Sequence, residues 1–192
     1  MKSVVKVFNN VKLKWTNFSG KPGEYNNVRG KNSRGEDIGD RLFNIVLTEQ
    51  MAEELRNMEL VTKSGKVVRG ANVKAYVPDD VDADPSYTLK VSFGSFAPEA
   101  IWRVVPRGRM ALNLDTVDNL DKEIIDHADV KVVFSAWEKG SKCGIGAYLQ
   151  KLIAYVSEDD FDHNDDFLNI PIIGGDGSEA NYGPDEDDEI PF

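Results

Sequence analysis

The chain has 192 residues, 41% of them hydrophobic, and its 23 Lys and Arg against 33 Asp and Glu give a formal net charge of −10. This length suits one domain with an appendage better than two full domains. A single cysteine, Cys143, excludes an internal disulfide framework, and no apolar run is long enough for a membrane span or a secretory leader. We therefore expect a soluble protein of a reducing, intracellular compartment.

The negative charge is concentrated at the end of the sequence. All 23 Lys and Arg lie before residue 157, whereas 13 of the 33 acids lie after it, so the body carries 20 acids against 23 bases and the tail is a polyanion. Acidic, Gly-rich sequence cannot bury enough apolar surface to stay folded. We expect a folded domain over residues 1–156 and a flexible tail over 157–192, in which only "FLNIPII" (167–173) is apolar enough to pack back on the body.

The first half of the body reads mainly as strands. Residues 3–18 alternate, with Asn9 and Asn10 marking a turn or a bulge. Residues 19–40 are rich in Gly, Asn and Ser, which predicts a long exposed loop or a loose hairpin. A strand is expected over 41–48, followed by a helix over 49–60 capped by Thr48. Alternation over 11–16 predicts one face of Val11, Leu13 and Trp15 and an opposite face of Lys12, Lys14 and Thr16.

The second half continues in the same way. Residues 64–66 form a turn into 67–78, and a strand is expected over 86–94. Residues 115–128 are expected to form a second helix. Residues 129–156 contain two closing strands around a Gly-rich turn.

Several strands, irregular loops and one or two helices indicate a mainly β protein. We expect an OB-fold barrel with inserted loops, because this fold often carries a helix between strands and leaves a groove open to nucleic acid. Periodicity leaves an SH3-like barrel and a small sandwich open as alternatives.

The residues needed for catalysis are not found together. His127 and His163 lie in unrelated contexts, and Cys143 has no supporting signature of a nucleophile. Residues 140–146 contain glycines and a lysine without the spacing of a phosphate loop, and residues 160–171 fail the pattern of a calcium loop. We expect no enzyme activity, no cofactor and no metal.

Two acid-poor patches, residues 1–34 and residues 101–110, combine cations with aromatic rings, the two ingredients of single-stranded nucleic-acid binding. For Trp15, core burial and base stacking remain equally open; Tyr25 and Phe18 are better stacking candidates, and Tyr76 and Tyr87 flank loops. The candidate DNA contacts are Lys12, Lys14, Trp15, Phe18, Lys21, Tyr25, Arg29, Lys31, Arg34, Tyr76, Tyr87, Trp102, Arg103, Arg107 and Arg109.

The chain ends in "DEDDEIPF", a run of five acids followed by Ile190, Pro191 and Phe192. This ending resembles the acidic tip of bacterial single-stranded DNA-binding proteins (SSB). The resemblance implies that Phe192 docks on replication and repair proteins with Ile190 and Pro191 beside it. The implied partner-binding tip is Asp185, Glu186, Asp187, Asp188, Glu189, Ile190, Pro191 and Phe192.

The body differs from bacterial SSB, and residues 130–156 resemble the closing strands of phage-encoded single-stranded DNA-binding proteins. The two resemblances together imply a phage protein that binds single-stranded DNA in replication, recombination or repair in the host cytoplasm or nucleoid. Its tip would recruit a polymerase, helicase or recombinase. The alternative is an adaptor that captures the host's SSB-binding partners without binding DNA.

Overall fold

The structure is a computed structural model that describes residues 3–24, 26–31, 35–76, 85–93 and 98–157. Of the residues predicted to have a role, Tyr25, Arg34 and the tip Asp185–Phe192 lie outside these ranges, as does the apolar stretch 167–173. The boundary expected at residue 157 therefore stays a prediction. Within the described residues, no helix combines the length and apolar character needed to cross a membrane.

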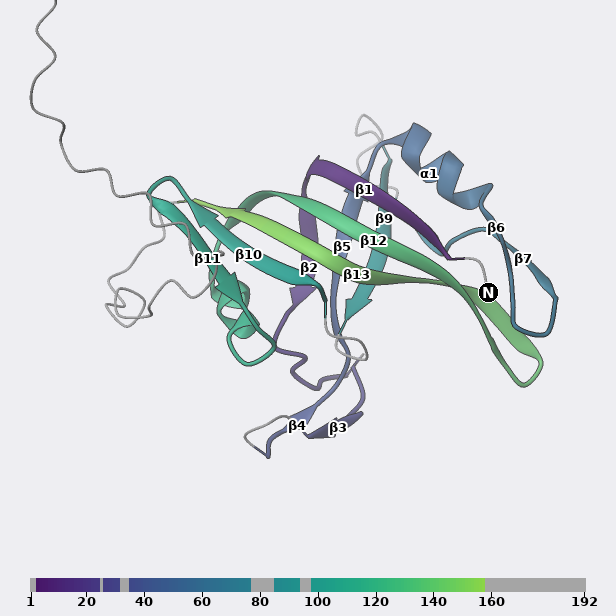
Figure 1. The fold of residues 1–192 in the computed structure, drawn as a ribbon, viewed down its shortest axis with the longest axis horizontal. Coiled ribbons are helices and arrows are strands. Elements are labelled where there is room, and N and C mark those ends of the chain that lie inside the picture. The colour runs from purple at the N-terminus through teal and green to yellow at the C-terminus, as the bar shows by residue number, and fades with distance from the viewer. Residues whose placement is uncertain (1–2, 25, 32–34, 77–84, 94–97, 158–192) are drawn as a thin grey trace, which may run out of the picture.

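The body is mainly β, as predicted (Figure 1). The strands in chain order are β1 Val4–Val11, β2 Leu13–Asn17, β3 Gly30–Lys31, β4 Asp37–Ile38, β5 Arg41–Leu47, β6 Glu59–Val61, β7 Val67–Arg69, β8 Val73–Tyr76, β9 Ser86–Phe93, β10 Ala100–Val105, β11 Gly108–Leu112, β12 Ile125–Lys139 and β13 Lys142–Val156. The helices are α1 Glu49–Arg56 and the short 3₁₀ helix η1 Val117–Lys122.

One sheet contains nine of these strands. Its main path runs β1-β12-β13-β9-β5-β2. Off this path, β10 pairs with β13, β11 pairs with β10, and β8 pairs with β9. The path begins at β1 and ends at β2, which are separated along the chain only by Lys12. The hydrogen-bonded path itself is not a closed ring in the described residues, so the closed barrel expected from the sequence is not shown.

The long hairpin β12–β13 runs across the whole sheet, with β1 beside β12 and β10 beside β13 (Figure 1). Residues Gly140 and Ser141 connect its strands, and Gly140 has a φ of 61°, which a left-handed turn position requires. The two closing strands and their Gly-containing turn were thus predicted correctly.

The N-terminal strands confirm a bulge rather than a turn at Asn9–Asn10. The register of β1 against β12 shifts between Phe8 and Val11, and Asn10 has a φ of 53°. A second irregularity in β2 changes the prediction that Trp15 shares a face with Val11 and Leu13. Trp15 itself has a φ of 48°, which breaks the alternation, and its side chain is 59% exposed while Val11 is buried.

The prediction of the first helix is confirmed, and the prediction of the second helix is wrong. Thr48 caps α1 by accepting a hydrogen bond from the Met51 backbone N–H at 3.3 Å, but the helix ends at Arg56 instead of continuing to residue 60. The helix expected over 115–128 is reduced to the six residues of η1, and β12 begins at Ile125. Alternating burial from Ala128 to Ala136 shows why: every second side chain enters the core, a period that a helix cannot match.

The core is one cluster of aliphatic and aromatic side chains enclosed by the sheet, α1 and η1. Three rings, Phe18, Phe43 and Phe93, pack with centroids 5.6 to 6.3 Å apart, and Phe18 and Phe43 are fully buried. Phe18 was a predicted base-stacking residue; that prediction is wrong, because its ring fills the core where no base can reach it.

Candidate nucleic-acid interface

A set of exposed lysines lies on one face of four adjacent strands. Lys14 of β2 pairs with Asn44 of β5, which pairs with Lys90 of β9, so the three side chains share a face in register. On β8, Lys74 pairs with Thr88, two residues before Lys90, and Tyr76 follows Lys74 by two residues. We call Lys14, Asn44, Lys74, Tyr76 and Lys90 the basic face.

The positive charge of the basic face is not cancelled by its neighbours. Lys14, Lys74 and Lys90 are all exposed, and no carboxylate among the described residues forms an ion pair with any of them. Adjacent strands lie only about 4.8 Å apart, so the lysines present several charges within a short span. The face can therefore attract a chain of phosphates.

Exposed aromatic side chains flank these lysines. Trp15 follows Lys14 and is 59% exposed, and Tyr76 is 54% exposed. The structure thus decides between the two readings of Trp15: its indole is not in the core. Its left-handed backbone is unusual for a bulky residue and is the kind of strain that gathers at ligand-binding positions.

The loop between β2 and β5 is held at its base by Asp121 of η1. Asp121 accepts hydrogen bonds from the backbone N–H groups of Phe18 and Ser19, each at 2.8 Å. Gly20, with a φ of 70°, packs so closely on Ile38 that a Cβ there would lie 2.8 Å from it. These contacts fix where the loop leaves the sheet.

Two of the predicted DNA-binding cations in the loop between β2 and β5 are already paired with acids of the same loop. Arg29 forms an ion pair with Asp40 at 3.3 Å and Lys31 one with Asp37 at 3.2 Å. Both pairs are exposed, so each contributes little stability and can open in favour of a phosphate. Lys12 and Lys21 are exposed without such a partner in the described residues.

A half-buried arginine, Arg41, begins β5 directly after this loop. The guanidinium of Arg41 donates to the Leu114 carbonyl at 2.8 Å, and burial lowers its pKa, an effect that Asp115 and Asp118 oppose. Arg41 therefore links β5 to the segment before η1, and we assign it a structural role and not a DNA contact.

The second predicted patch is the β10–β11 hairpin, and only part of it is accessible. The prediction for Arg103 is wrong: its side chain is 5% exposed, and its Nε donates to both carboxylate oxygens of Glu123, at 2.8 and 2.9 Å. Arg107 and Arg109 are exposed, but Arg109 lies 5.0 Å over the ring of half-buried Trp102. A cation already occupies one face of that ring.

Tyr87 resembles Trp102 in this respect. Its ring is half-buried, and the guanidinium carbon of Arg56 lies 4.9 Å from its centroid. Of Tyr76 and Tyr87, the two loop-flanking tyrosines among the candidate DNA contacts, only Tyr76 has a largely exposed side chain.

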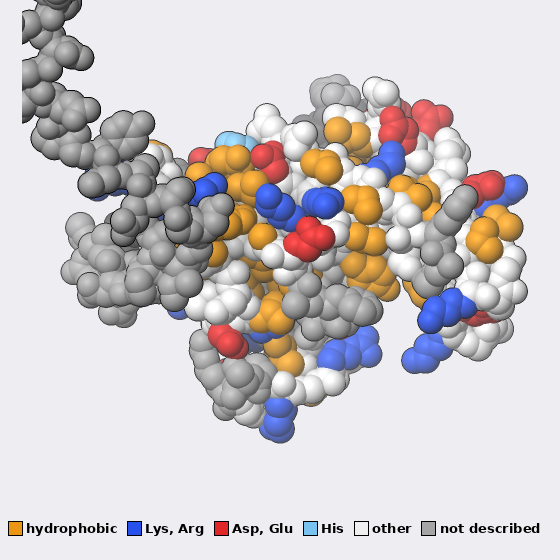
Figure 2. Space-filling model, in the orientation of Figure 1, with side chains coloured by type: hydrophobic (Ala, Val, Ile, Leu, Met, Phe, Trp, Pro, Cys, Tyr) orange, Lys and Arg blue, Asp and Glu red, His pale blue; other side chains and the backbone are white. Residues whose placement is uncertain are grey.

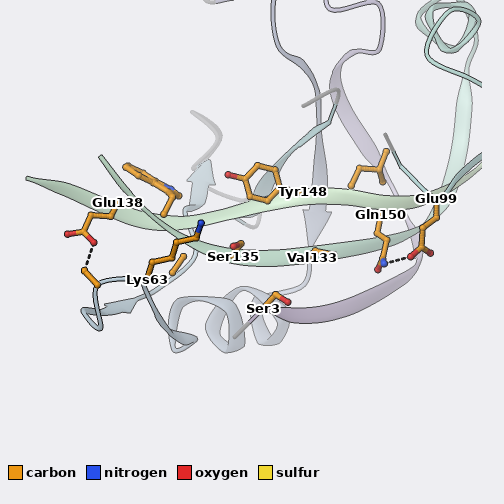
Figure 3. A pocket seen from close by; sticks show the side chains of 12 residues that line it. Ser3, Lys63, Glu99, Val133, Ser135, Glu138, Tyr148 and Gln150 are labelled. Atoms are coloured by element: carbon orange, nitrogen blue, oxygen red, sulfur yellow. Dashed lines mark hydrogen bonds between the residues drawn. The ribbon is translucent and has the colours of Figure 1, made fainter. Parts of the chain in front are cut away.

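Sequence reasoning missed several residues that the fold brings to this surface. Asn44, Lys74 and Lys90 lie within expected strands, and only the strand pairing reveals that they join Lys14. Trp137 and Tyr148, on the β12–β13 hairpin, border an open groove (Figure 3). The sequence contained a signal for Trp137 and Tyr148. Gly144 and Gly146 lie two positions apart within an expected strand, and glycine inside a strand often marks a place where another group lies close against the backbone.

The remaining chemistry is sparse. Within the described ranges, no group of three or more His, Cys, Asp and Glu side chains is placed to hold a metal ion. His127 lies in β12 instead of ending a helix, and its ring stacks on Tyr155 with centroids 4.3 Å apart. Cys143 is half-buried beside the core.

A mainly β body that displays unpaired lysines and exposed aromatic rings along adjacent strands has the surface of a nucleic-acid-binding protein. A family model described as "Putative phage ssDNA-binding domain" matches residues 4–189, and the chain belongs to that family. No curated protein matches the sequence.

Three solved structures of a single-stranded DNA-binding protein from bacteriophage Enc34 are similar to this chain. The C-terminally truncated form is 12% identical, with a TM-score of 0.45, over 81% of this chain and 87% of that one. The form in complex with ssDNA is 16% identical, with a TM-score of 0.45, over 82% and 89%. A third structure is 13% identical, with a TM-score of 0.44, over 85% and 89%.

Proposed function

We propose that this protein binds single-stranded DNA without sequence preference, as a non-enzymatic protein of phage replication, recombination or repair. The observation that carries the proposal is the basic face, in a chain of the phage ssDNA-binding domain family. Lysines on adjacent strands neutralise phosphates, and exposed rings such as Trp15 and Tyr76 accept stacked bases of any sequence.

The strand arrangement supports an OB-type barrel. Taking β1 and β2 as one bent first strand, the following long strands are β5, β9, β12 and β13, and β9 pairs with β13 in parallel. In OB-folds, oligonucleotides bind the face of the second and third strands together with the loops after the first and fourth. In this chain the two strands are β5 and β9, which carry Asn44 and Lys90, and the two loops are residues 18–40 and the turn at Gly140 and Ser141 between β12 and β13.

The acidic tail has a second role in the proposal. With 13 acids and no base, residues 157–192 compete with DNA for the basic face, and bound DNA releases them. The released tip then binds partner proteins through Phe192. Its terminal carboxylate binds a basic site on the partner and its ring fills an adjacent apolar pocket, while Pro191 restricts the backbone and so lowers the entropy lost on binding. Its resemblance to the bacterial SSB tip supports this role, in the host cytoplasm.

Titration of fluorescently labelled oligo(dT) with the full chain and with a variant ending at Val156 tests both parts. We expect both to bind at low salt and the shorter variant to bind more tightly. Absence of binding by both would refute DNA binding and, if host proteins are still retained by the tip, favour the adaptor alternative. Equal affinities would refute only the competition by the tail.

A further inference from the structure

The outward side of β1, β12, β13 and β10 is unusually apolar for a sheet surface that faces water. Val5 and Val7 of β1 are 48% and 58% exposed. Figure 2 shows hydrophobic side chains, with basic ones among them, across these strands. Six apolar side chains alternate with inward ones and form what we call the outer apolar face: Val5, Val7, Trp102, Val104, Val133 and Ile153.

The strand register makes these side chains neighbours. Val5 pairs with Val133 across β1 and β12, and Ile153 pairs with Trp102 across β13 and β10. Strands that are apolar on both sides are typical of a sheet that is covered on both sides. A contiguous apolar patch on the outside of a protein marks an interaction surface. We therefore expect another segment or protein to cover this face.

Two lysines lie directly opposite each other in the middle of the same surface. Lys131 of β12 pairs with Lys151 of β13, and Val7 pairs with Lys131 on its other side. Glu99 lies 3.6 Å from Lys131, but no carboxylate of the described residues forms an ion pair with Lys151. Like charges directly opposite on adjacent strands are destabilising. A segment that combines acids with apolar side chains is therefore the best cover for this face.

The chain itself continues into such a segment. β13 ends at Val156, and the Ser157 backbone N–H donates to the Ile124 carbonyl at 3.1 Å, which fixes where the tail leaves the body. Residues 158–166 contain six acids and no base, and the apolar stretch 167–173, "FLNIPII", follows directly. Fully extended, residues 158–166 span about 30 Å. This length is enough to run back along β13 as far as the row of Val5 and Val133.

The order of charged and apolar residues along the tail matches their order along the face. Going back along β13 from Val156, Lys151 comes first, and the position that pairs with Val133 comes three residues later. A tail that turns and runs back in this direction brings Asp165 and Asp166 to the lysine pair before the apolar stretch reaches the valines.

A second copy of the chain fits this face less well. A symmetric dimer places the same patch of both copies in contact, so it would bring the Lys131–Lys151 pair of one copy against the same pair of the other. That contact adds like charges where the tail supplies opposite ones.

We propose that residues 165–173 dock on the outer apolar face of their own chain, with Asp165 and Asp166 on the lysine pair and the apolar stretch over the valines of β1 and β12. The docked segment is an anchor, and residues 174–192 form the arm that carries the acidic tip. The anchor itself does not depend on DNA binding. One consequence rests on the proposed function: competition with DNA is then confined to the acids of the arm.

Disulfide formation in the full chain tests this contact. Cys143→Ser removes the only native cysteine, and Val7→Cys with Leu168→Cys then places one thiol on the face and one in the anchor. The matched control combines Leu168→Cys with Val28→Cys, because Val28 is similarly exposed, at 54%, but lies in the loop of residues 18–40. A docked segment raises the local concentration of its thiol, so we expect the Val7 pair to form an intramolecular disulfide about tenfold faster than the control pair.

Charge reversal tests the lysine contacts separately. Asp165→Lys/Asp166→Lys should slow the disulfide of the Val7 pair to the control rate, and adding Lys131→Glu/Lys151→Glu should restore it. Equal rates for the Val7 and Val28 pairs before any reversal would overturn the proposal. A disulfide-linked dimer as the main product would also overturn it, by assigning the face to a second copy. Because the assay contains no DNA, each of these results leaves the proposed function standing.

Discussion

The ion pair between Arg103 and Glu123 is predicted to stabilise the fold and to have no direct part in binding. Their side chains are 5% and 15% exposed, and Arg103 Nε contacts both carboxylate oxygens within 2.9 Å. Glu123→Gln therefore neutralises the buried carboxylate to which Arg103 Nε donates both hydrogen bonds. Removing one partner of a buried pair costs about 3–5 kcal/mol. For a domain of this size, that corresponds to a fall in melting temperature of roughly 6–20 °C.

The assay is thermal unfolding of Glu123→Gln, Arg103→Met and the double variant Arg103→Met/Glu123→Leu, followed by circular dichroism. Each single variant should lose stability, and the double variant should lose less than the sum, because no charge is then buried alone. Affinity for oligo(dT), measured well below the melting temperature, should stay within about twofold of the native value. If Arg103→Met melts normally but binds DNA weakly, the assignment of Arg103 to the core is refuted.

Three further results are expected. Phe18→Ala should cost about 3–5 kcal/mol of unfolding free energy through the cavity it leaves beside Phe43, which chemical denaturation measures; a stable variant with weakened DNA binding would contradict this. Burial and then Asp129 raise the pKa of Tyr155 above its usual 10.0, so Asp129→Asn should lower the phenol pKa seen by ultraviolet titration. The folded chain holds the phenol proton of Tyr155 more tightly than the unfolded chain does. The stability that this proton contributes is therefore fully present below pH 10 and is lost as the pH rises through the raised pKa. A phenol pKa that does not change in Asp129→Asn would contradict this prediction. Asp121→Asn should loosen the base of the 18–40 loop and speed its cleavage by protease, and an unchanged rate would show that the two hydrogen bonds do not hold it.

Much of the fold could be predicted because its strands alternate clearly. The closing hairpin, the cap at Thr48 and the mainly β class followed from local pattern. The prediction of the second helix failed because the polar residues 115–123 permit a helix, whereas residues 125 onward pair with two other strands. These are β13, later in the chain, and β1, more than a hundred positions earlier. Local sequence does not record such pairing.

The candidate site was harder to predict than the fold. Exposure decides whether an aromatic or basic residue can bind, and exposure depends on strand register and local backbone. A single left-handed residue turns Trp15 outward, whereas Phe18, three positions later, is fully buried. Lys90 could not be selected from the sequence, because its neighbours Lys14 and Asn44 join it only through the pairing of β2, β5 and β9.

The measurement that tests the central proposal most directly is the salt dependence of oligo(dT) binding by a Lys14→Gln/Lys90→Gln variant. Each phosphate contact with a single strand contributes about 0.7 to the slope of log K against log salt. The variant should therefore show a slope shallower by about 1.4, together with weaker binding at low salt. Arg69→Gln/Lys122→Gln, which removes two exposed charges elsewhere, should leave the slope unchanged. Native slope and affinity in the Lys14/Lys90 variant would contradict the assignment of the basic face.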